Sequence, residues 1–356
     1  MKFRKLILPA FIAVIIAIGF ASCTGTKSAE KQPKHSGIEY YRLLQFSETP
    51  YDIERGIHPL TADQAKTINA YKLTYNDKGQ LLSVEYVRDN VLLDYSAMGA
   101  AKIEYTYTGN NIQTKKYYNS KNEQIQNQGI SAVEYSLNND GVRVGLMFYD
   151  KDGNMIDNRN GIHSYTWSIL PDGMVKENRY NLKGEEVVMN PFCPFYELRF
   201  TYNDKGYVTR MANYMADTLY NCTAENCGDI GVSYFTFTPN DNGDVEKFEV
   251  YNVTGQMSNL YWGWSKRISK FDENGYVSET TYYDQDNEIV GGKQVPTTRY
   301  KYDDHGALVE TSSYDKDGNL MNNPQNGIAI TQYRYDDAGN RVETLNFDLN
   351  NVAVKQ

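Results

Sequence analysis

Aromatic side chains are concentrated in stretches that interrupt a regular sequence repeat. Aromatic rings can stack on sugar rings or pack against a partner protein. Three stretches carry them, at residues 191–196, 219–222 and 261–264. The candidate binding residues in these stretches are Phe192, Phe195, Tyr196, Tyr220, Trp262 and Trp264. The alternative is that the same rings fill a local core, in which case their removal would lower stability rather than binding.

Cysteines accompany the aromatic stretches and could form a disulfide in an oxidising compartment. Cys222 and Cys227 are close in sequence and are the favoured pair. Cys193 and Cys227, however, follow their preceding turn glycines by nearly the same distance, so equivalent positions in a stacked array would bring them together. A bond from Cys193 to one of the other two is therefore the alternative, and one thiol stays unpaired in either case.

Residues suited to catalysis or metal binding are scarce. The four histidines, His35, His58, His163 and His305, are not spaced to share a metal with another His or Cys. The sequence has no Gly-Lys-Ser/Thr phosphate loop and no Gly-x-Ser-x-Gly elbow. Residues 150–154 and 315–319 read Asp-Lys-Asp-Gly-Asn but lack the third oxygen ligand and the distal Glu of a calcium loop. We therefore expect no enzyme, no cofactor and no metal. Weak calcium binding is the alternative, for which Asp284, Asp286 and Glu288 offer a comparable cluster.

The first 22 residues have the order of a secretory signal: a basic head, an apolar run from Leu6 to Phe20, and small residues before Cys23. The apolar run of about 15 residues is shorter than the roughly 20 that span a membrane. The segment resembles a bacterial lipoprotein signal, although Phe20 stands where an aliphatic residue is usual. The resemblance implies that Cys23 is lipidated with acyl chains such as palmitate. Ordinary cleavage with a free cysteine and an uncleaved anchor helix are the alternatives.

The stretch after the signal, residues 23–37, is rich in Lys, Ser, Thr and Gly and indicates a flexible tether. Thr24 occupies the position where some lipoproteins carry an aspartate that retains them in the inner membrane, so the resemblance implies the outer membrane. Whether the folded part faces the periplasm or the cell surface is undecided. The formal charge of −9, with no basic run, excludes nucleic acid as an expected partner. The expected partners are the membrane, through the lipid anchor, and a glycan or an envelope protein.

The elements that must position these residues repeat with a period of about 32 residues, which is typical of a stacked repeat architecture. Each copy contains a Tyr/Phe-Asp/Asn-x-x-Gly turn or a close variant of it. The anchoring glycines are Gly79, Gly109, Gly141, Gly173, Gly206, Gly243, Gly275, Gly306 and Gly339. An incomplete copy is expected to start at Tyr40 and to include Tyr51-Asp52, giving about nine and a half units.

Every turn of this kind predicts a β-hairpin, and each copy is expected to carry two. The Asp or Asn side chain can accept hydrogen bonds from backbone amides ahead of it, and the Gly can adopt a positive φ at no steric cost. A type I turn followed by a left-handed residue makes a three-residue hairpin loop with a bulge. At the second turn Asn122, Asn287 and Asn351 replace Gly, and Asn is the next-best residue for that conformation.

This turn pattern resembles the YD-repeat family over about residues 40–356, and it is closest to the repeats of about 30 residues in bacterial secreted proteins. The resemblance implies antiparallel strands coiled into a long sheet that serves as a scaffold. We expect an all-β, elongated array of antiparallel β-hairpins, as a twisted sheet or an open β-solenoid, over residues 38–356. Residues 60–69 are expected to form one short helix capped by Thr61 or Asp63.

Together these patterns favour a membrane-anchored, non-catalytic binding scaffold of the bacterial envelope with an unknown ligand. One alternative is a purely structural envelope spacer, whose surface would be uniformly polar. The other is a glycan-active enzyme, which would need two carboxylates facing each other across a cleft at about 5–10 Å. The sequence contains periodic surface acids, but their spacing does not predict such a pair.

Overall fold

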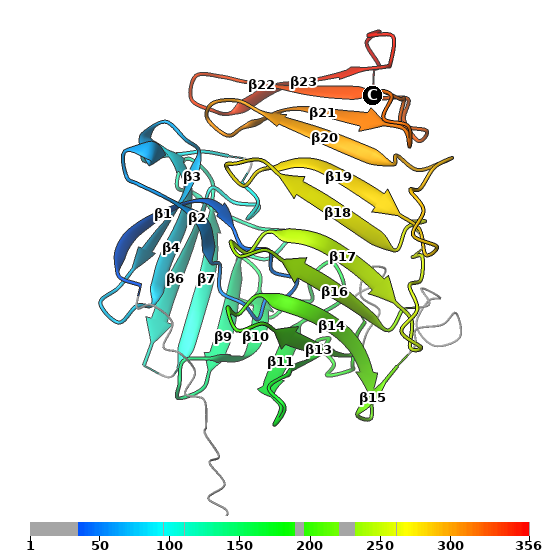
Figure 1. Cartoon of the computed structure of the whole chain (residues 1–356). Coiled ribbons are helices and arrows are strands. Elements are labelled where there is room, and N and C mark those ends of the chain that lie inside the picture. The colour runs from blue at the N-terminus through cyan, green and yellow to red at the C-terminus, as the bar shows by residue number, and fades with distance from the viewer. Residues whose placement is uncertain are drawn as a thin grey trace, which may run out of the picture. The chain divides into compact units, whose positions relative to one another are not determined.

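Successive antiparallel hairpins make up nearly the whole described chain (Figure 1). The computed structural model describes residues 35–94, 96–109, 111–188, 196–220, 232–260 and 262–355. The hairpins are β3 (Ala70–Tyr75) with β4 (Leu81–Arg88), β6 (Lys102–Thr108) with β7 (Ile112–Tyr118), β9 (Ala132–Leu137) with β10 (Arg143–Tyr149), β11 (Ser164–Ile169) with β12 (Val175–Tyr180), β13 (Glu197–Tyr202) with β14 (Val208–Met215), β16 (Tyr234–Pro239) with β17 (Val245–Tyr251), β18 (Lys266–Phe271) with β19 (Val277–Tyr283), β20 (Thr297–Tyr302) with β21 (Leu308–Tyr314), and β22 (Ile330–Tyr335) with β23 (Arg341–Phe347).

The turn chemistry predicted from the sequence is present. At the turn between β20 and β21, Asp303 Oδ1 accepts the backbone amides of His305 at 2.9 Å and Ala307 at 2.8 Å. Gly306 follows in the left-handed region with φ +81°. At the second turns Asn122, Asn287 and Asn351 adopt φ values of 61°, 65° and 61°, so Asn does replace Gly there. Each signature therefore stops one strand, reverses the chain and starts the next.

The hairpins join edge to edge into one 23-stranded antiparallel sheet. The second strand of one hairpin pairs with the first strand of the next; for example Thr280 of β19 lies opposite Thr298 of β20. Three short strands, β5 (Val91–Leu92), β8 (Gln124–Ile125) and β15 (Thr218–Leu219), extend the sheet beside second turns. Equivalent positions of successive copies are consequently neighbours, which confirms the elongated hairpin array.

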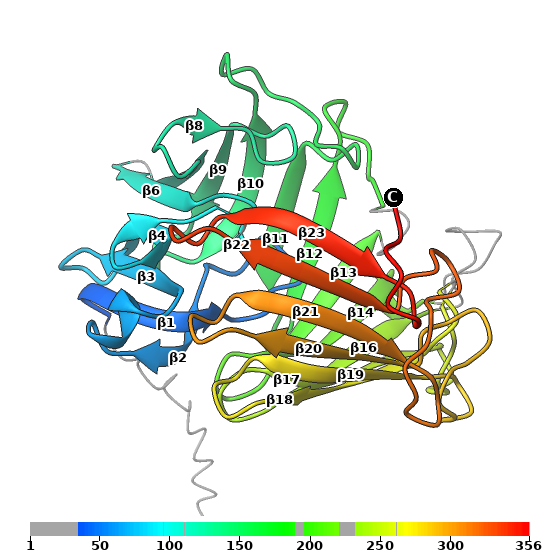
Figure 2. The same cartoon turned by 90° about the horizontal axis from the view of Figure 1, so that it is seen from above.

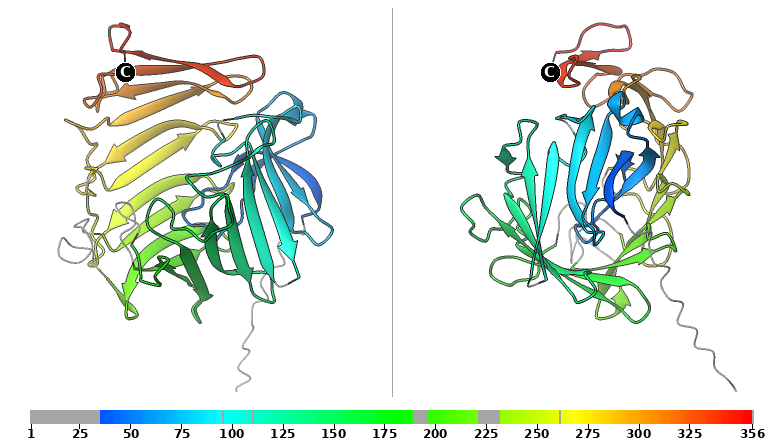
Figure 3. Two further views of the ribbon diagram at one scale, coloured as in Figure 1. Left: turned by 180° about the vertical axis from the view of Figure 1, so that it is seen from behind. Right: turned by 90° about the vertical axis from the view of Figure 1, so that its left-hand side faces the viewer.

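The sheet also curls, and its first and last parts come into contact (Figures 2 and 3). The backbone amide of Asn69 donates to the carbonyl of His305 at 2.8 Å. Arg88 donates to the carbonyl of Asp337 at 3.0 Å. The two end strands, β2 (Gly56–Leu60) and β23, are not hydrogen-bonded to each other in the described residues. The curled sheet is thus open, and all of it belongs to one compact unit, His35–Gln356.

The start of the sheet departs from the expected incomplete copy. β1 (Gly37–Leu44) pairs with β2 and with β3, but Tyr51-Asp52 is not a hairpin turn. Residues 45–55, here called the inserted segment, run across the interior of the curl. Arg143 donates to the carbonyls of Pro50 and Asp52 at 2.8 and 2.9 Å, and Glu54 pairs with Lys115. These long-range contacts, rather than local turn chemistry, decide the path of the segment.

The helix expected over 60–69 is reduced to a single 3-10 turn, η1 (Gln64–Lys66). Thr61 does cap it: the Gln64 amide donates to Thr61 Oγ1 at 3.2 Å, and the Thr61 amide donates to Gln64 Oε1 at 2.8 Å. Asp63 makes no capping hydrogen bond. The turn ends early because the Asn69 amide is used in the contact with His305 and β3 begins at Ala70.

One face of the sheet, here called the inner face, carries the hydrophobic core, but its chemistry changes along the chain. The core cluster runs from Tyr71 to Leu260 and stops before β18. The position eight residues before the turn glycine shows the change. It is apolar or aromatic in five of the earlier hairpins, at Tyr71, Val133, Tyr165, Leu198 and Phe235. In the last three hairpins the same position holds Arg267, Thr298 and Thr331. Five residues after the turn glycine, Val84, Leu146, Met211 and Phe248 give way to Thr280, Thr311 and Thr344.

Strand pairing keeps these positions on one face. Phe248 lies opposite Arg267, Thr280 opposite Thr298, and Thr311 opposite Thr331. Residues directly opposite each other in an antiparallel pair point to the same side of the sheet. The last three hairpins, β18 to β23, therefore turn a mainly hydroxyl-bearing face towards the side on which the earlier hairpins bury apolar residues.

Candidate binding face

Two of the predicted aromatic residues, Trp262 and Trp264, meet just before β18. Their ring centroids are 4.9 Å apart, and Trp262 Nε1 donates to the Trp264 carbonyl at 2.9 Å. Trp264 also lies edge-on to Phe248 of the core at 5.8 Å and close to Tyr282 at 4.9 Å. Trp264 thus contacts both the last part of the hydrophobic core and the hydroxyl-bearing face, and its role in binding stays a prediction.

The other predicted site residues are distributed differently. Tyr196 and Tyr220 are half-buried, and Tyr220 packs against the core while its backbone amide donates to the Asn213 carbonyl at 2.9 Å. The remaining residues lie outside the described part of the chain, so the aromatic, disulfide and lipidation predictions that rest on them stay predictions. They are Cys23, Phe192, Cys193, Phe195, Cys222 and Cys227.

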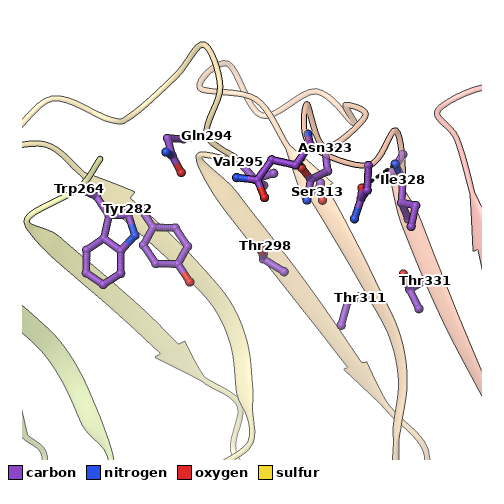
Figure 4. A pocket seen from close by; sticks show the side chains of 13 residues that line it. Trp264, Tyr282, Gln294, Val295, Thr298, Thr311, Ser313, Asn323, Ile328 and Thr331 are labelled. Carbon is purple, nitrogen blue, oxygen red and sulfur yellow. Dashed lines mark hydrogen bonds between the residues drawn. The ribbon is translucent and has the colours of Figure 1, made fainter. Parts of the chain in front are cut away.

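A groove of about 360 Å³, here called the hydroxyl groove, opens on the inner face beside Trp264 (Figure 4). Trp264 and Tyr282 form an aromatic wall at one end. The floor comes from strand residues of β20, β21 and β22 whose side chains carry hydroxyl groups: Thr298, Thr311, Ser313 and Thr331. Strand positions that are mainly apolar in the earlier hairpins therefore form the polar floor of the groove.

Amide side chains form the rim of the hydroxyl groove. Gln294 comes from the connection between β19 and β20, and Asn323, Gln325 and Asn326 come from the connection between β21 and β22. The second connection is held in shape by its own hydrogen bonds, because Asn323 Oδ1 accepts the Gln325 amide at 2.9 Å. Val295, Ile328 and Ala329 complete the lining, in which none of the residues carries a formal charge.

This composition suits a neutral ligand rich in hydroxyl groups. Hydroxyl and amide side chains can both donate and accept hydrogen bonds, so they match the hydroxyl groups of a sugar. An aromatic wall offers a flat apolar surface to the C–H face of a sugar ring. A few convergent polar groups beside an apolar wall are also the usual make-up of a small-molecule site. The groove has no pair of carboxylates in its lining of the kind that glycoside hydrolysis uses.

The histidines and turn acids have structural partners. His58 Nε2 lies 2.8 Å from Asp244 Oδ1, and His305 Nδ1 lies 2.7 Å from the Thr67 carbonyl. Asp150 Oδ1 accepts the amides of Asp152 and Asn154, so the Asp-Lys-Asp-Gly-Asn run there acts as a hairpin turn. Across the described ranges, no three His, Cys, Asp or Glu side chains are grouped to hold a metal ion.

Sequence reasoning missed Tyr282 and the threonine floor. The signal was present in the repeat alignment: the position eight residues before the turn glycine changes from Phe235 to Arg267, Thr298 and Thr331. A change of side-chain chemistry at a fixed repeat position marks a change in what that face contacts, because repeat units stack at equivalent positions.

The chain was compared with protein families, curated proteins and solved structures. No protein-family model and no curated protein matches the chain. Among solved structures, TcdB2-TccC3 without its hypervariable C-terminal region, a YD-repeat toxin, is 12% identical with a TM-score of 0.20; the match covers 89% of this chain and 19% of that one. A porin-like protein from Bacteroides uniformis is 12% identical with a TM-score of 0.23, and 86% of this chain and 93% of that chain are covered. Likenesses at these TM-scores support no conclusion about the fold or the function of this chain. Within the described residues, no helix is both long and apolar enough to cross a membrane.

Proposed function

We propose that this protein is a non-catalytic binding scaffold of the bacterial envelope, and that its hydroxyl groove holds a neutral oligosaccharide. The observation that carries the proposal is the change along the inner face from a closed apolar core to an uncharged groove. A spacer would have no reason to replace core residues by threonines beside an aromatic wall. An uncharged lining favours a neutral ligand over an acidic or basic one.

We further propose that a lipid anchor attaches the scaffold to the outer membrane. A YD-repeat-like lipoprotein with acyl chains on Cys23 would display the hairpin array from the outer membrane on the tether of residues 23–37. The shape of the groove supports binding of a chain rather than a single ring, because it crosses β19 to β22. Neighbouring strands lie about 4.8 Å apart, so three strand spacings give a path of roughly 14 Å.

A glycan array probed with the full-length protein in detergent tests the proposal. We expect binding to neutral oligosaccharides, and we expect Trp264→Phe to weaken it by up to about tenfold because a smaller ring covers less of the sugar face. Phenylalanine is the better substitution because Trp264 also packs on Phe248 and its loss would lower stability. If the protein binds no glycan on the array, the structural spacer is favoured. If it cleaves a glycan that it binds, the enzyme is favoured.

A further inference from the structure

A second cavity, of about 630 Å³ and here called the tyrosine cavity, lies where the curled sheet meets itself. β1, β3 and β4 contribute to one side, and β18 to β23 contribute to the other. Tyrosine rings make up much of its wall: Tyr276 and Tyr302 stack with centroids 4.6 Å apart, and Tyr71 and Tyr86 lie 5.0 Å apart. It therefore offers flat apolar surfaces to a ligand, at the opposite ends of the strands from the hydroxyl groove.

Two polar atoms of this lining are buried without a hydrogen-bond partner among the described residues. One is Oδ1 of Asn69, a residue that is only 3% exposed, and the other is Nε of Arg267. Buried polar groups in native proteins are nearly always hydrogen-bonded, so such atoms point to an absent partner. Asn69 Oδ1 needs a donor, whereas Arg267 Nε needs an acceptor.

The charges around the cavity favour an anionic acceptor. Both carboxylates of the lining already have partners: Asp244 lies 2.8 Å from His58 Nε2, and Asp94 accepts the Ser120 hydroxyl at 2.9 Å. Glu48 also interacts electrostatically with Arg267, and burial raises the pKa of Glu48 to about 7. At neutral pH Glu48 is thus partly uncharged and compensates the Arg267 charge only in part.

We propose that the tyrosine cavity binds a small hydroxylated carboxylate, such as a sugar acid. Its carboxylate would accept from Arg267, one hydroxyl would donate to Asn69 Oδ1, and the ring face would lie on the tyrosines. Charge-assisted hydrogen bonds to Arg are among the stronger polar contacts in proteins. The site stands apart from the neutral ligand of the hydroxyl groove, although Tyr282 lines both spaces.

Isothermal titration of the full-length protein with three probes tests this site. D-glucuronate carries the carboxylate and the hydroxyls, D-glucose carries the hydroxyls, and benzoate carries the carboxylate on a flat ring. We expect glucuronate to bind at least about tenfold more tightly than either of the others, since each of them lacks one of the two polar contacts. Equal binding of glucose would contradict the role of Arg267, and equal binding of benzoate would contradict the role of Asn69.

The substitution Arg267→Met keeps the aliphatic stem and removes the charge, so we expect glucuronate affinity to fall at least about tenfold. Arg299→Met is the matched control, because Arg299 is exposed and pairs with Glu279 instead. If Arg267→Met does not fold, the Nε–H resonance of Arg267 in the unaltered protein gives the answer. It should move when glucuronate is added, and a resonance that stays in place at saturating glucuronate would overturn the assignment.

Discussion

Buried acids at the inserted segment make the stability of this protein depend on pH. Burial raises the pKa of Glu48 to about 7 and that of Asp52 to about 6. The native state therefore holds these protons more tightly than the unfolded chain, whose pKa values are near 4.5 and 3.8. The stability that these two groups contribute is complete below the unfolded values and is lost as the pH rises through about 6 to 7.

We expect Glu48→Gln to flatten this dependence, because glutamine keeps the shape of protonated glutamate and never ionises. The melting temperature of the unaltered protein should fall between pH 5 and pH 7.5 by more than that of the variant. Glu343→Gln, at an exposed ion pair with Arg334, is the control and should leave the pH dependence as it is. Identical slopes for the protein and its Glu48→Gln variant would show that the carboxyl group of Glu48 is not buried.

At the scale of the element, the turn glycines differ in what surrounds them, and this gives a paired prediction. Gly306 and Gly318 both have a positive φ, +81° and +83°. A Cβ on Gly306 would lie 1.8 Å from the Tyr276 hydroxyl oxygen, whereas nothing lies within 4 Å of one on Gly318. Alanine at either position adds about 1–2 kcal/mol for the left-handed backbone, but Gly306→Ala must also displace Tyr276.

Urea unfolding of the two variants measures the difference. We expect Gly318→Ala to lower the free energy of unfolding by about 1–2 kcal/mol, and Gly306→Ala to lower it by at least about 1 kcal/mol more. The two substitutions share the same chemistry, so the comparison isolates the contact with Tyr276. Equal losses would mean that the turn of Gly306 does not pack against the neighbouring hairpin.

The hairpins themselves were predictable because their information is local. Asp303 and Gly306 specify a turn within five residues, and the same signature recurs in copy after copy. The short helix was only partly predictable. The Thr61 cap is local, but its early end depends on a hydrogen bond from Asn69 to His305, more than 200 residues away.

At the scale of the whole molecule, the inserted segment connects hairpins that are far apart in sequence. Arg143 is buried and anchors the segment: Nη1 donates to the carbonyls of Pro50 and Asp52, Nε donates to Gln113 at 3.0 Å, and the guanidinium lies over the Tyr135 ring. Neither the curl nor this insertion could be predicted from the sequence. Both depend on contacts between residues about 90 positions apart or more, which the repeat period does not encode.

We expect Arg143→Met to lower the free energy of unfolding by about 3–5 kcal/mol, because three hydrogen bonds from a charged donor are lost while their acceptors on Pro50, Asp52 and Gln113 stay in place. Hydrogen exchange of the amides in residues 45–55 should accelerate more than exchange in β13 or β16. Arg334→Met, on an exposed side chain, should change neither quantity by much. Uniform acceleration across the sheet would show that the segment is not separately anchored.

The central claim is that the last three hairpins present a ligand-binding face where the earlier ones present a core. The triple variant Thr298→Val, Thr311→Val, Thr331→Val tests it most directly, because valine keeps the shape of threonine and favours strands, so folding should be preserved. Thr281→Val with Thr297→Val on the outer face, where the two hydroxyls are 3.1 Å apart, is the control.

The measurement is the affinity of both variants for the neutral oligosaccharide that the unaltered protein binds best, together with their melting temperatures. The account predicts at least about a tenfold loss of affinity in the triple variant, from hydrogen bonds worth about 1 kcal/mol each. The melting temperature should fall only slightly, through loss of the hydrogen bond from Thr331 Oγ1 to Asn346 Oδ1 at 2.9 Å. The control should bind normally. Full affinity in a folded triple variant would contradict the account.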